Sequence, residues 1–295
     1  MLGEEHQFIG FLLTSLSIGE IIFACLLTSI VLVLIMFHLS YNRIEQDDRV
    51  ILILSINIYL SCLIYMLLFF IFLLRSALGD IYHIEFDTMG CVFIGYIYAV
   101  SLCVLYLSFT NQAFFRLCRI VYPQYKCLQN SNLYILIVPI EAIFASILLL
   151  PIYIWNDIIY LRNDHFCFVP ISNVRGYLWI FLSVYGIPVI SLSLIYVRIT
   201  IYIRQQSNQP IRIKRRQKRD LNAIRGIFIL VGFLLFLGIP TLILMIIMFI
   251  TGDEHPLTFR VTCLSIGTSM VGLSVAMITS IPQLKVIIWK GSQST

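Results

Sequence analysis

Charged side chains are scarce in this sequence. Only 12% of its 295 residues are Asp, Glu, Lys or Arg, whereas 60% are hydrophobic, and the mean hydropathy is +0.94. A soluble domain typically carries about 25% charged residues. Because so few charges cannot cover a water-exposed surface, the composition predicts an integral membrane protein. Its apolar runs are about 20 residues or longer, which favours helices over the shorter alternating strands of an outer-membrane barrel.

Several signatures of catalysis and transport are also missing. The sequence has no GxxxxGK[ST] phosphate-binding loop and no evident internal repeat, and its five histidines are scattered without the spacing of metal ligands. No paired acids and no nucleophile–base set stand out, so we expect neither an enzyme nor a bound metal or cofactor. A transporter would need coupled ionisable groups near the bilayer midplane. The two intramembrane acids, Glu20 and Glu141, are too few and unpaired for that class.

Seven apolar runs predict the fold. They cover about 11–40, 50–74, 91–118, 133–154, 177–204, 222–250 and 259–289. We therefore predict an all-α fold, a single seven-transmembrane helix bundle over residues 1–295. Lys and Arg concentrate on the cytoplasmic side of such proteins. Four of the 20 would lie outside if the N-terminus is outside, namely Arg75, Arg162, Arg175 and Arg260. This asymmetry predicts an outside N-terminus and a cytoplasmic C-terminus.

The third run has a cysteine at one end and an arginine at the other. No charged residue lies between Cys91 and Arg116. At about 1.5 Å per residue the helix between them is about 37 Å long, slightly more than the hydrocarbon core of a bilayer, about 30 Å. We expect Cys91 at the outer membrane surface and Arg116 at the inner one, where the sequence reads FRLCRIVYP.

This pattern resembles the third helix of the rhodopsin-like (class A) G-protein-coupled receptors. That family has a cysteine at the outer end of this helix and Asp-Arg-Tyr-x-x-Ile-x-x-Pro at its inner end. The spacing from Cys91 to Arg116 matches, but Phe115 stands in place of the acid and Leu117 in place of the tyrosine.

The resemblance implies a disulfide bond across the outer surface. The longest outer loop, 155–175, contains one cysteine, Cys167. Cys91 and Cys167 are the cysteines expected at the oxidising surface, and in the family these two positions are bonded. Cys263, near the outer end of the last helix, is the alternative partner.

Three prolines stand at family positions and are expected to act as helix hinges. They are Pro188, Pro240 and Pro282, in the fifth, sixth and seventh helices. A proline removes a backbone hydrogen bond, so the helix can bulge or bend there. Beside two of them the family's residues are replaced, Trp by Gly238 and Asn by Ile281.

The resemblance also implies a switch at the inner surface. Tyr196 lies eight residues after Pro188 and would turn toward Arg116 on activation, and Asp220 would pair with Arg116 in the inactive state. The alternatives are an interfacial anchor for Tyr196 and a local basic partner for Asp220. Six of the eight residues 212–219 are basic. We expect this run to attract anionic membrane lipids, with no nucleic-acid partner.

Three polar residues are expected inside the bundle. Asn57 stands for the family's sodium-binding acid, with an interhelical hydrogen bond as the alternative. Glu141 lies near mid-membrane, where an acid indicates a functional site or a protonated carboxyl bonded to a backbone carbonyl. Glu20 either faces the bundle or reaches the outer headgroups.

The resemblance excludes two ligand classes. The acid that binds amines in the family is Tyr98 here, and the lysine that binds retinal is Val275. Tyr98, Thr241 and Met245 are candidates for the pocket wall, with a plain core role as the alternative for each. The acidic outer loops favour a peptide or amphipathic ligand.

The expected function is therefore that of a plasma-membrane receptor. An extracellular ligand would favour a state in which the sixth helix swings out about Pro240 and activates a heterotrimeric G protein. Because Phe115 removes one restraint on Arg116, we expect ligand-free activity. The alternative is a receptor fold that no longer signals and acts as a scaffold or decoy, since residues beside nearly every landmark differ.

Overall fold

The structure is a computed structural model of the whole chain. It describes residues 2–41, 46–125, 130–205, 232, 243, 246, 247, 250 and 257–280. Asp220, Pro240, Thr241, Met245 and Pro282 lie outside the described residues, as does most of the expected helix over 222–250.

The described chain is built almost entirely of helices. In chain order these are α1 (Leu2–Tyr41), α2 (Gln46–Tyr82), α3 (Met89–Val121), α4 (Ser131–Ile154), α5 (Val174–Ile180), the π-helical η2 (Phe181–Gly186), α6 (Ile187–Gln205) and α9 (Thr258–Ser280). α5, η2 and α6 form one continuous rod. Within the described residues, six helices are long and apolar enough to cross a membrane. The chain is therefore a multi-pass membrane protein with a helical bundle.

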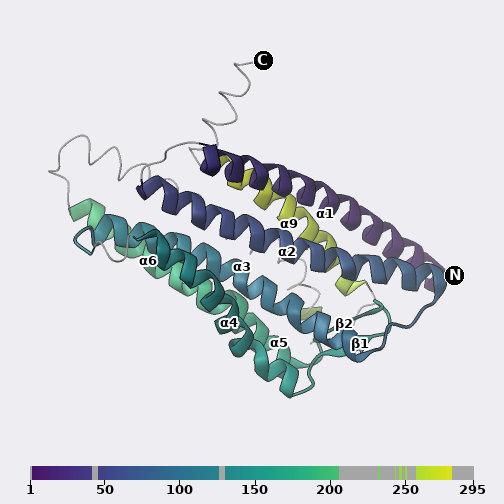
Figure 1. The fold of residues 1–295 in the computed structure, drawn as a ribbon. Coiled ribbons are helices and arrows are strands. Elements are labelled where there is room, and N and C mark those ends of the chain that lie inside the picture. The colour runs from purple at the N-terminus through teal and green to yellow at the C-terminus, as the bar shows by residue number, and fades with distance from the viewer. Residues whose placement is uncertain are drawn as a thin grey trace, which may run out of the picture.

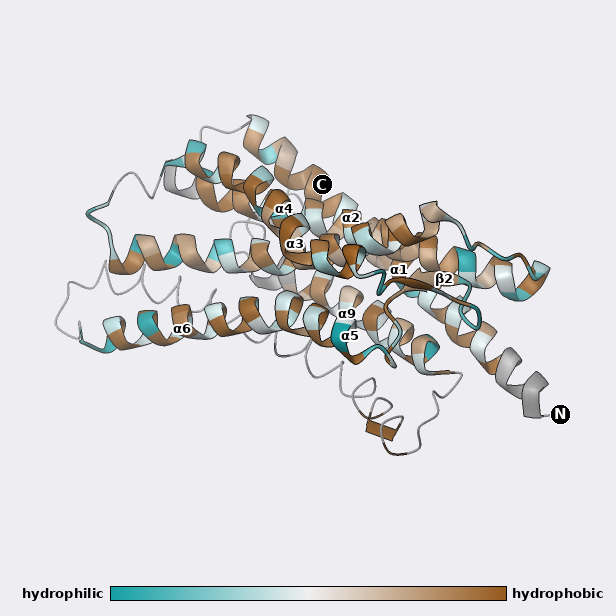
Figure 2. Ribbon diagram, turned by 90° about the horizontal axis from the view of Figure 1, so that it is seen from below, coloured by the Kyte–Doolittle hydropathy of each residue, from teal (hydrophilic) through white to brown (hydrophobic). Residues whose placement is uncertain are grey.

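α3 is the central helix of the bundle. It packs against α2, α4, η2 and α6, whereas α1 lies on the other side of α2 and contacts α9 (Figure 1). The burial pattern follows from this position, because α3 is covered on most sides while α1 and α4 turn broad apolar faces outward. Hydrophobic residues cover these helices on the outside as well as the inside (Figure 2). Exposed Phe23, Ile147 and Leu194 illustrate the lipid-facing surface.

A short β-hairpin covers one end of the bundle. Its strands are β1 (Ile159–Leu161) and β2 (Phe166–Phe168), which pair antiparallel with Tyr160 opposite Cys167. We call this the hairpin end and the opposite one the Arg116 end. The hairpin lies very close to α3, because a Cβ atom at Gly95 would collide with the backbone carbonyl of Cys167. A side chain at position 95 would push the hairpin off the helix.

The predicted end of the second helix is wrong. The apolar run stops near residue 74, and we expected a loop over 75–90, but α2 continues to Tyr82. The added turns are held by contacts that the sequence pattern does not display. Asp80 is bound by Arg260 of α9, and Gly79 leaves room for the side chain of His165.

Candidate functional site

An aromatic cavity lies beneath the hairpin, with a volume of about 110 Å³. It is bounded by α2, α3, the rod formed by α5 and η2, α9 and the segment around β2. Its described lining comprises Phe69, Phe72, Tyr98, Leu102, Phe166, Phe168, Ile171, Tyr177, Ile180, Phe181, Tyr185, Phe259, Thr262, Cys263 and Ile266. No charged side chain is among these residues.

Two phenylalanines of β2 close the cavity toward the hairpin end, and we call Phe166 and Phe168 the roof. The ring of Phe166 stacks on Phe72 of α2 with 5.1 Å between centroids. Phe168 meets Tyr98 of α3 edge-on at 5.7 Å. Such aromatic pairs contribute about 0.5–1.5 kcal/mol beyond the area they bury. The roof therefore packs directly on two helices of the bundle.

Tyr98 is the polar residue at the base of these rings. Its hydroxyl lies 2.7 Å from the hydroxyl of Tyr65 on α2. One of the two hydroxyls donates to the other, which leaves one hydroxyl hydrogen of the pair to donate elsewhere. When Tyr65 is the donor, the hydrogen of the Tyr98 hydroxyl can donate to another acceptor, and the described lining also includes the hydroxyl-bearing Tyr177, Tyr185 and Thr262.

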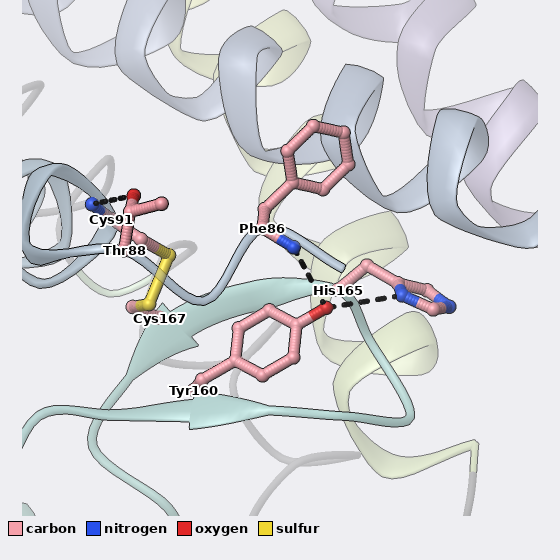
Figure 3. The surroundings of a disulfide bond; sticks show 6 residues. All are labelled: Phe86, Thr88, Cys91, Tyr160, His165 and Cys167. Atoms are coloured by element: carbon pink, nitrogen blue, oxygen red, sulfur yellow. Dashed lines mark hydrogen bonds between the residues drawn. A yellow bond between two sulfur atoms is a disulfide. The ribbon is translucent and has the colours of Figure 1, made fainter. Parts of the chain in front are cut away.

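A disulfide bond joins Cys91 to Cys167 and ties β2 to the first turn of α3 (Figure 3). Thr88 caps that helix, because its side-chain oxygen accepts a hydrogen bond from the backbone N–H of Cys91 at 3.2 Å. On the other strand, the hydroxyl of Tyr160 accepts from the N–H of Phe86 at 3.3 Å. Cys263, the alternative partner, is a free and buried thiol.

Arg260 of α9 forms a second tie to the hairpin, and the sequence pattern did not reveal it. All five of its N–H groups donate: two to the carboxylate of Asp80, one to Asp164, one to the hydroxyl of Thr14 and one to the carbonyl oxygen of Asn163. The guanidinium joins α1, α2, α9 and the hairpin, and only 6% of Arg260 is exposed. The sequence predicts only that this arginine lies on the outer side. No sequence pattern near Arg260 predicts that it binds Asp80 and Asp164.

Two ionisable groups in the segment that contains the hairpin have shifted pKa values. Burial lowers the pKa of His165, and Arg260 adds to this, whereas the carboxylate of Asp80, 3.8 Å away, opposes it. The pKa of His165 therefore lies below the ordinary value for histidine, and the imidazole is neutral at pH 7. Burial acts to raise the pKa of Asp157, but hydrogen bonds from Arg175 at 2.6 Å and Asn173 at 2.8 Å outweigh it and lower the pKa.

The helix that contains Pro188 widens just before it. η2 ends at Gly186, and the N–H of Ile187 donates to the carbonyl of Leu182, five residues earlier. Pro188 has no N–H to donate, so the regular bond to the preceding turn is absent there. The widened turn carries Tyr185 into the cavity wall, where its ring lies 5.1 Å from Tyr106.

The Arg116 end contains the predicted switch residues that the structure describes. Arg116 is buried, with 5% exposed, and the preceding Phe115 meets Tyr134 of α4 edge-on at 5.1 Å. Tyr196 of α6 packs into an apolar cluster with Ile120, one turn beyond Arg116 on α3. The structure thus places Tyr196 and the arginine helix side by side, and Asp220 lies outside the described residues.

Asn57 and Glu141 meet at the interface of α2, α3 and α4. The amide of Asn57 donates to the hydroxyl of Ser108 at 3.0 Å and to Glu141 at 3.3 Å, and Ser108 lies 3.4 Å from Glu141. Glu141 thus accepts hydrogen bonds from side chains of α2 and α3. This matches the interhelical hydrogen bond that was the alternative for Asn57.

Glu20 lies apart from this group. It accepts a hydrogen bond from Thr268 of α9 at 3.1 Å, which links α1 to α9. Gly267 makes room for its carboxylate, since a Cβ atom there would collide with it.

Comparison with known proteins adds no identification: no protein-family model and no curated protein matches the sequence.

Proposed function

We propose that the chain is a rhodopsin-like receptor of the plasma membrane that binds a ligand at the hairpin end and activates a heterotrimeric G protein at the Arg116 end. The observation that carries this proposal is that α3 runs from the cavity to the Arg116 end. Tyr98 lines the cavity and Arg116 is buried near the other end of the same helix, about 27 Å farther along at about 1.5 Å per residue. A shift of α3 therefore acts at both ends of the bundle.

Two features favour an extracellular hairpin end. The disulfide bond between Cys91 and Cys167 lies there, and such bonds persist in oxidising compartments. The excess of Lys and Arg in the connections at the Arg116 end points the same way.

The connectivity of the described helices fits seven crossings. α6 ends at the Arg116 end, where Ile199 packs on Ile120, and α9 begins at the hairpin end, where Phe259 meets Phe166. Between Gln205 and Thr258 the sequence predicts a helix over 222–250, which would join these two ends.

In the proposed mechanism the ligand selects one of two bundle states. Binding in the cavity shifts the equilibrium only as far as the ligand prefers one arrangement of α3, η2 and α9 over the other. The π-helical turn before Pro188 gives η2 a place where its hydrogen bonding can change. Tyr196 and Arg116 then rearrange at the cytoplasmic surface, and the sixth helix moves outward about Pro240.

A ligand screen with G-protein nucleotide exchange as readout tests the proposal. Wild type, Arg116→Ala and Arg198→Ala are compared at equal surface density. Arg198 is the matched control, because it is an exposed basic residue near the same end of the bundle. Loss of exchange in Arg116→Ala alone supports a signalling receptor. Exchange at the level of mock-transfected cells in both wild type and Arg116→Ala instead supports the non-signalling scaffold, which the replaced residues around Arg116 favour.

A further inference from the structure

We infer that the cavity beneath the roof takes a small, uncharged molecule with a single aromatic ring and one hydrogen-bond acceptor. This inference rests on the proposed function and narrows its ligand from a peptide or amphipathic molecule to one chemical class. It follows from the size of the cavity, its chemistry and the fixed position of the hairpin.

The size sets the first limit. The cavity measures about 110 Å³, and an apolar cavity of about 150 Å³ holds a benzene molecule. The site is smaller than that cavity, so it admits at most one ring. Because the cavity is partly open, a substituent can extend through the opening, but a second ring has no place inside.

The chemistry of the wall sets the second limit. The described lining contains no charged side chain, and it presents rings such as Phe69, Phe72 and Phe259. Moving a charged group from water into such surroundings without a counter-charge is strongly unfavourable. Aromatic rings gain instead from edge-to-face contacts with these side chains. The wall thus selects a neutral ring over an ammonium or a carboxylate.

The hydroxyl pair at the base supplies the specificity. Tyr65 and Tyr98 share one hydrogen bond of 2.7 Å, and one hydroxyl hydrogen of the pair remains to donate. Tyr98 faces the cavity and Tyr65 is not part of its lining. When Tyr65 donates to Tyr98, the hydrogen of Tyr98 is free to donate to an oxygen on the ligand.

The roof sets the third limit. The disulfide bond from Cys167 to Cys91 holds the hairpin on α3, and Arg260 holds Asn163 and Asp164 on the other side of it. From the hairpin side, a peptide could fill the site only by lifting the hairpin and breaking the contacts of a buried guanidinium. A single ring fits beneath the roof as it stands.

The test uses the full-length protein in phosphatidylcholine nanodiscs. Binding of 4-fluorophenol is followed by fluorine relaxation, with empty nanodiscs to subtract partition into lipid. We expect saturable binding to wild type and loss of binding in Leu102→Phe, which fills the cavity. Leu107→Phe is the matched control, because Leu107 lies on the same helix outside the lining. Saturable binding by Leu107→Phe shows that the added ring volume does not unfold the protein.

Two further comparisons test the chemistry. The charged analogues 4-fluorobenzylamine and 4-fluorobenzoate are expected not to bind. Tyr98→Phe is expected to weaken 4-fluorophenol by about two- to tenfold, the usual value of one hydrogen bond, and to leave 4-fluorotoluene unchanged. Binding of the charged analogues as strong as that of 4-fluorophenol overturns the inference. The inference is also overturned if the amount of 4-fluorophenol bound, at concentrations up to about 1 mM, is the same for wild type, Leu102→Phe and empty nanodiscs.

Nucleotide exchange separates this inference from the proposed function. Binding that Leu102→Phe abolishes, without exchange on any G protein, supports the ligand class and counts against signalling. Exchange driven by a different ligand, without binding of 4-fluorophenol, supports signalling and overturns the ligand class.

Discussion

Arg260 on α9 and Asp80 on α2 form a two-point ion pair, with Nη1 to Oδ2 at 2.7 Å and Nη2 to Oδ1 at 3.0 Å. Asp80 lies in the part of α2 that extends beyond the apolar run. The pair therefore ties the last turns of α2 to the first turn of α9, at the level where the hairpin crosses the bundle. Its geometry makes the hairpin end a rigid frame for the cavity.

Removing one partner of this pair should destabilise the bundle. Arg260→Ala removes the guanidinium from the half-buried carboxylate of Asp80 and the buried one of Asp164, and breaking a buried pair costs about 3–5 kcal/mol. We expect a lower thermal unfolding temperature in detergent and reduced surface expression. Arg162→Ala, an exposed arginine of the same hairpin, should change neither. Equal unfolding temperatures of the two variants would show that the five hydrogen bonds do not form.

The disulfide bond should hold the roof in place. The two bonded cysteines are 76 residues apart in the sequence. Disulfide bonds typically contribute about 2–4 kcal/mol to the free energy of unfolding. Cys167→Ser should lower the unfolding temperature and weaken binding in the cavity, whereas Cys25→Ser should leave binding intact. Peptide mass spectrometry without reduction checks the pairing. A bond between Cys167 and Cys263 would contradict the structure.

Asn57 and Glu141 should be energetically coupled. Hydrogen bonds between transmembrane helices contribute about 0.6 kcal/mol on average and at most about 1.7. A double-mutant cycle of Asn57→Ala and Glu141→Ala should give a coupling of this size in unfolding experiments. The cycle of Asn57→Ala with Glu20→Ala is the control, because these residues do not contact each other and their effects should add within about 0.5 kcal/mol. Additivity in both cycles would exclude the contact at 3.3 Å.

The stabilisation from Asp157 should disappear at low pH. Its pKa is lower in the folded protein than the ordinary value of about 3.9. A lowered folded pKa adds stability above the unfolded pKa, and this stability is lost as pH falls through the folded pKa. Wild type should therefore be more stable than Asp157→Asn at pH 7, and the difference in unfolding temperature should shrink below about pH 4. A difference that stays constant down to pH 3 would contradict the lowered pKa.

Ligand-free activity is the remaining prediction. The residue before Arg116 is Phe115, which is fully buried and packs on Tyr134, so this position offers no carboxylate to restrain the arginine. We expect nucleotide exchange above that of mock-transfected cells in the absence of ligand, and its loss in Arg116→Ala. Exchange at the mock level, with good surface expression, would count against this prediction.

Local pattern was enough for the elements that span the membrane. Apolar runs predicted α3, α4 and the rod from α5 to α6 closely, because a chain in hydrocarbon must satisfy its backbone internally and long apolar stretches become helices. α1 begins at Leu2, nine residues before the predicted start at residue 11. The second helix extends beyond its apolar run to Tyr82. The sequence pattern did not predict these extra turns, because Asp80 is polar and Gly79 is small. Their contacts with Arg260 and His165 stabilise the turns. The seventh run is described only as far as Ser280.

The candidate site also has features that could be predicted from the sequence and features that could not. The pairing of Cys91 with Cys167 and the position of Tyr98 could be expected from the family resemblance. The roof could not, because Phe166 and Phe72 are distant in sequence and each is one apolar residue among many. The five contacts of Arg260 escaped prediction for the same reason: its partners come from three other segments of the chain.

The sequence by itself determined that this protein lies in a membrane and that it is helical, because these properties follow from composition and from the order of residues along the chain. The orientation that its charges predict remains a prediction. Only the tertiary structure decided which side chains meet beneath the hairpin and how large the space between them is. Those features depend on the relative placement of α2, α3, η2, α9 and β2. The sequence of any one of these segments does not specify how it packs against the others.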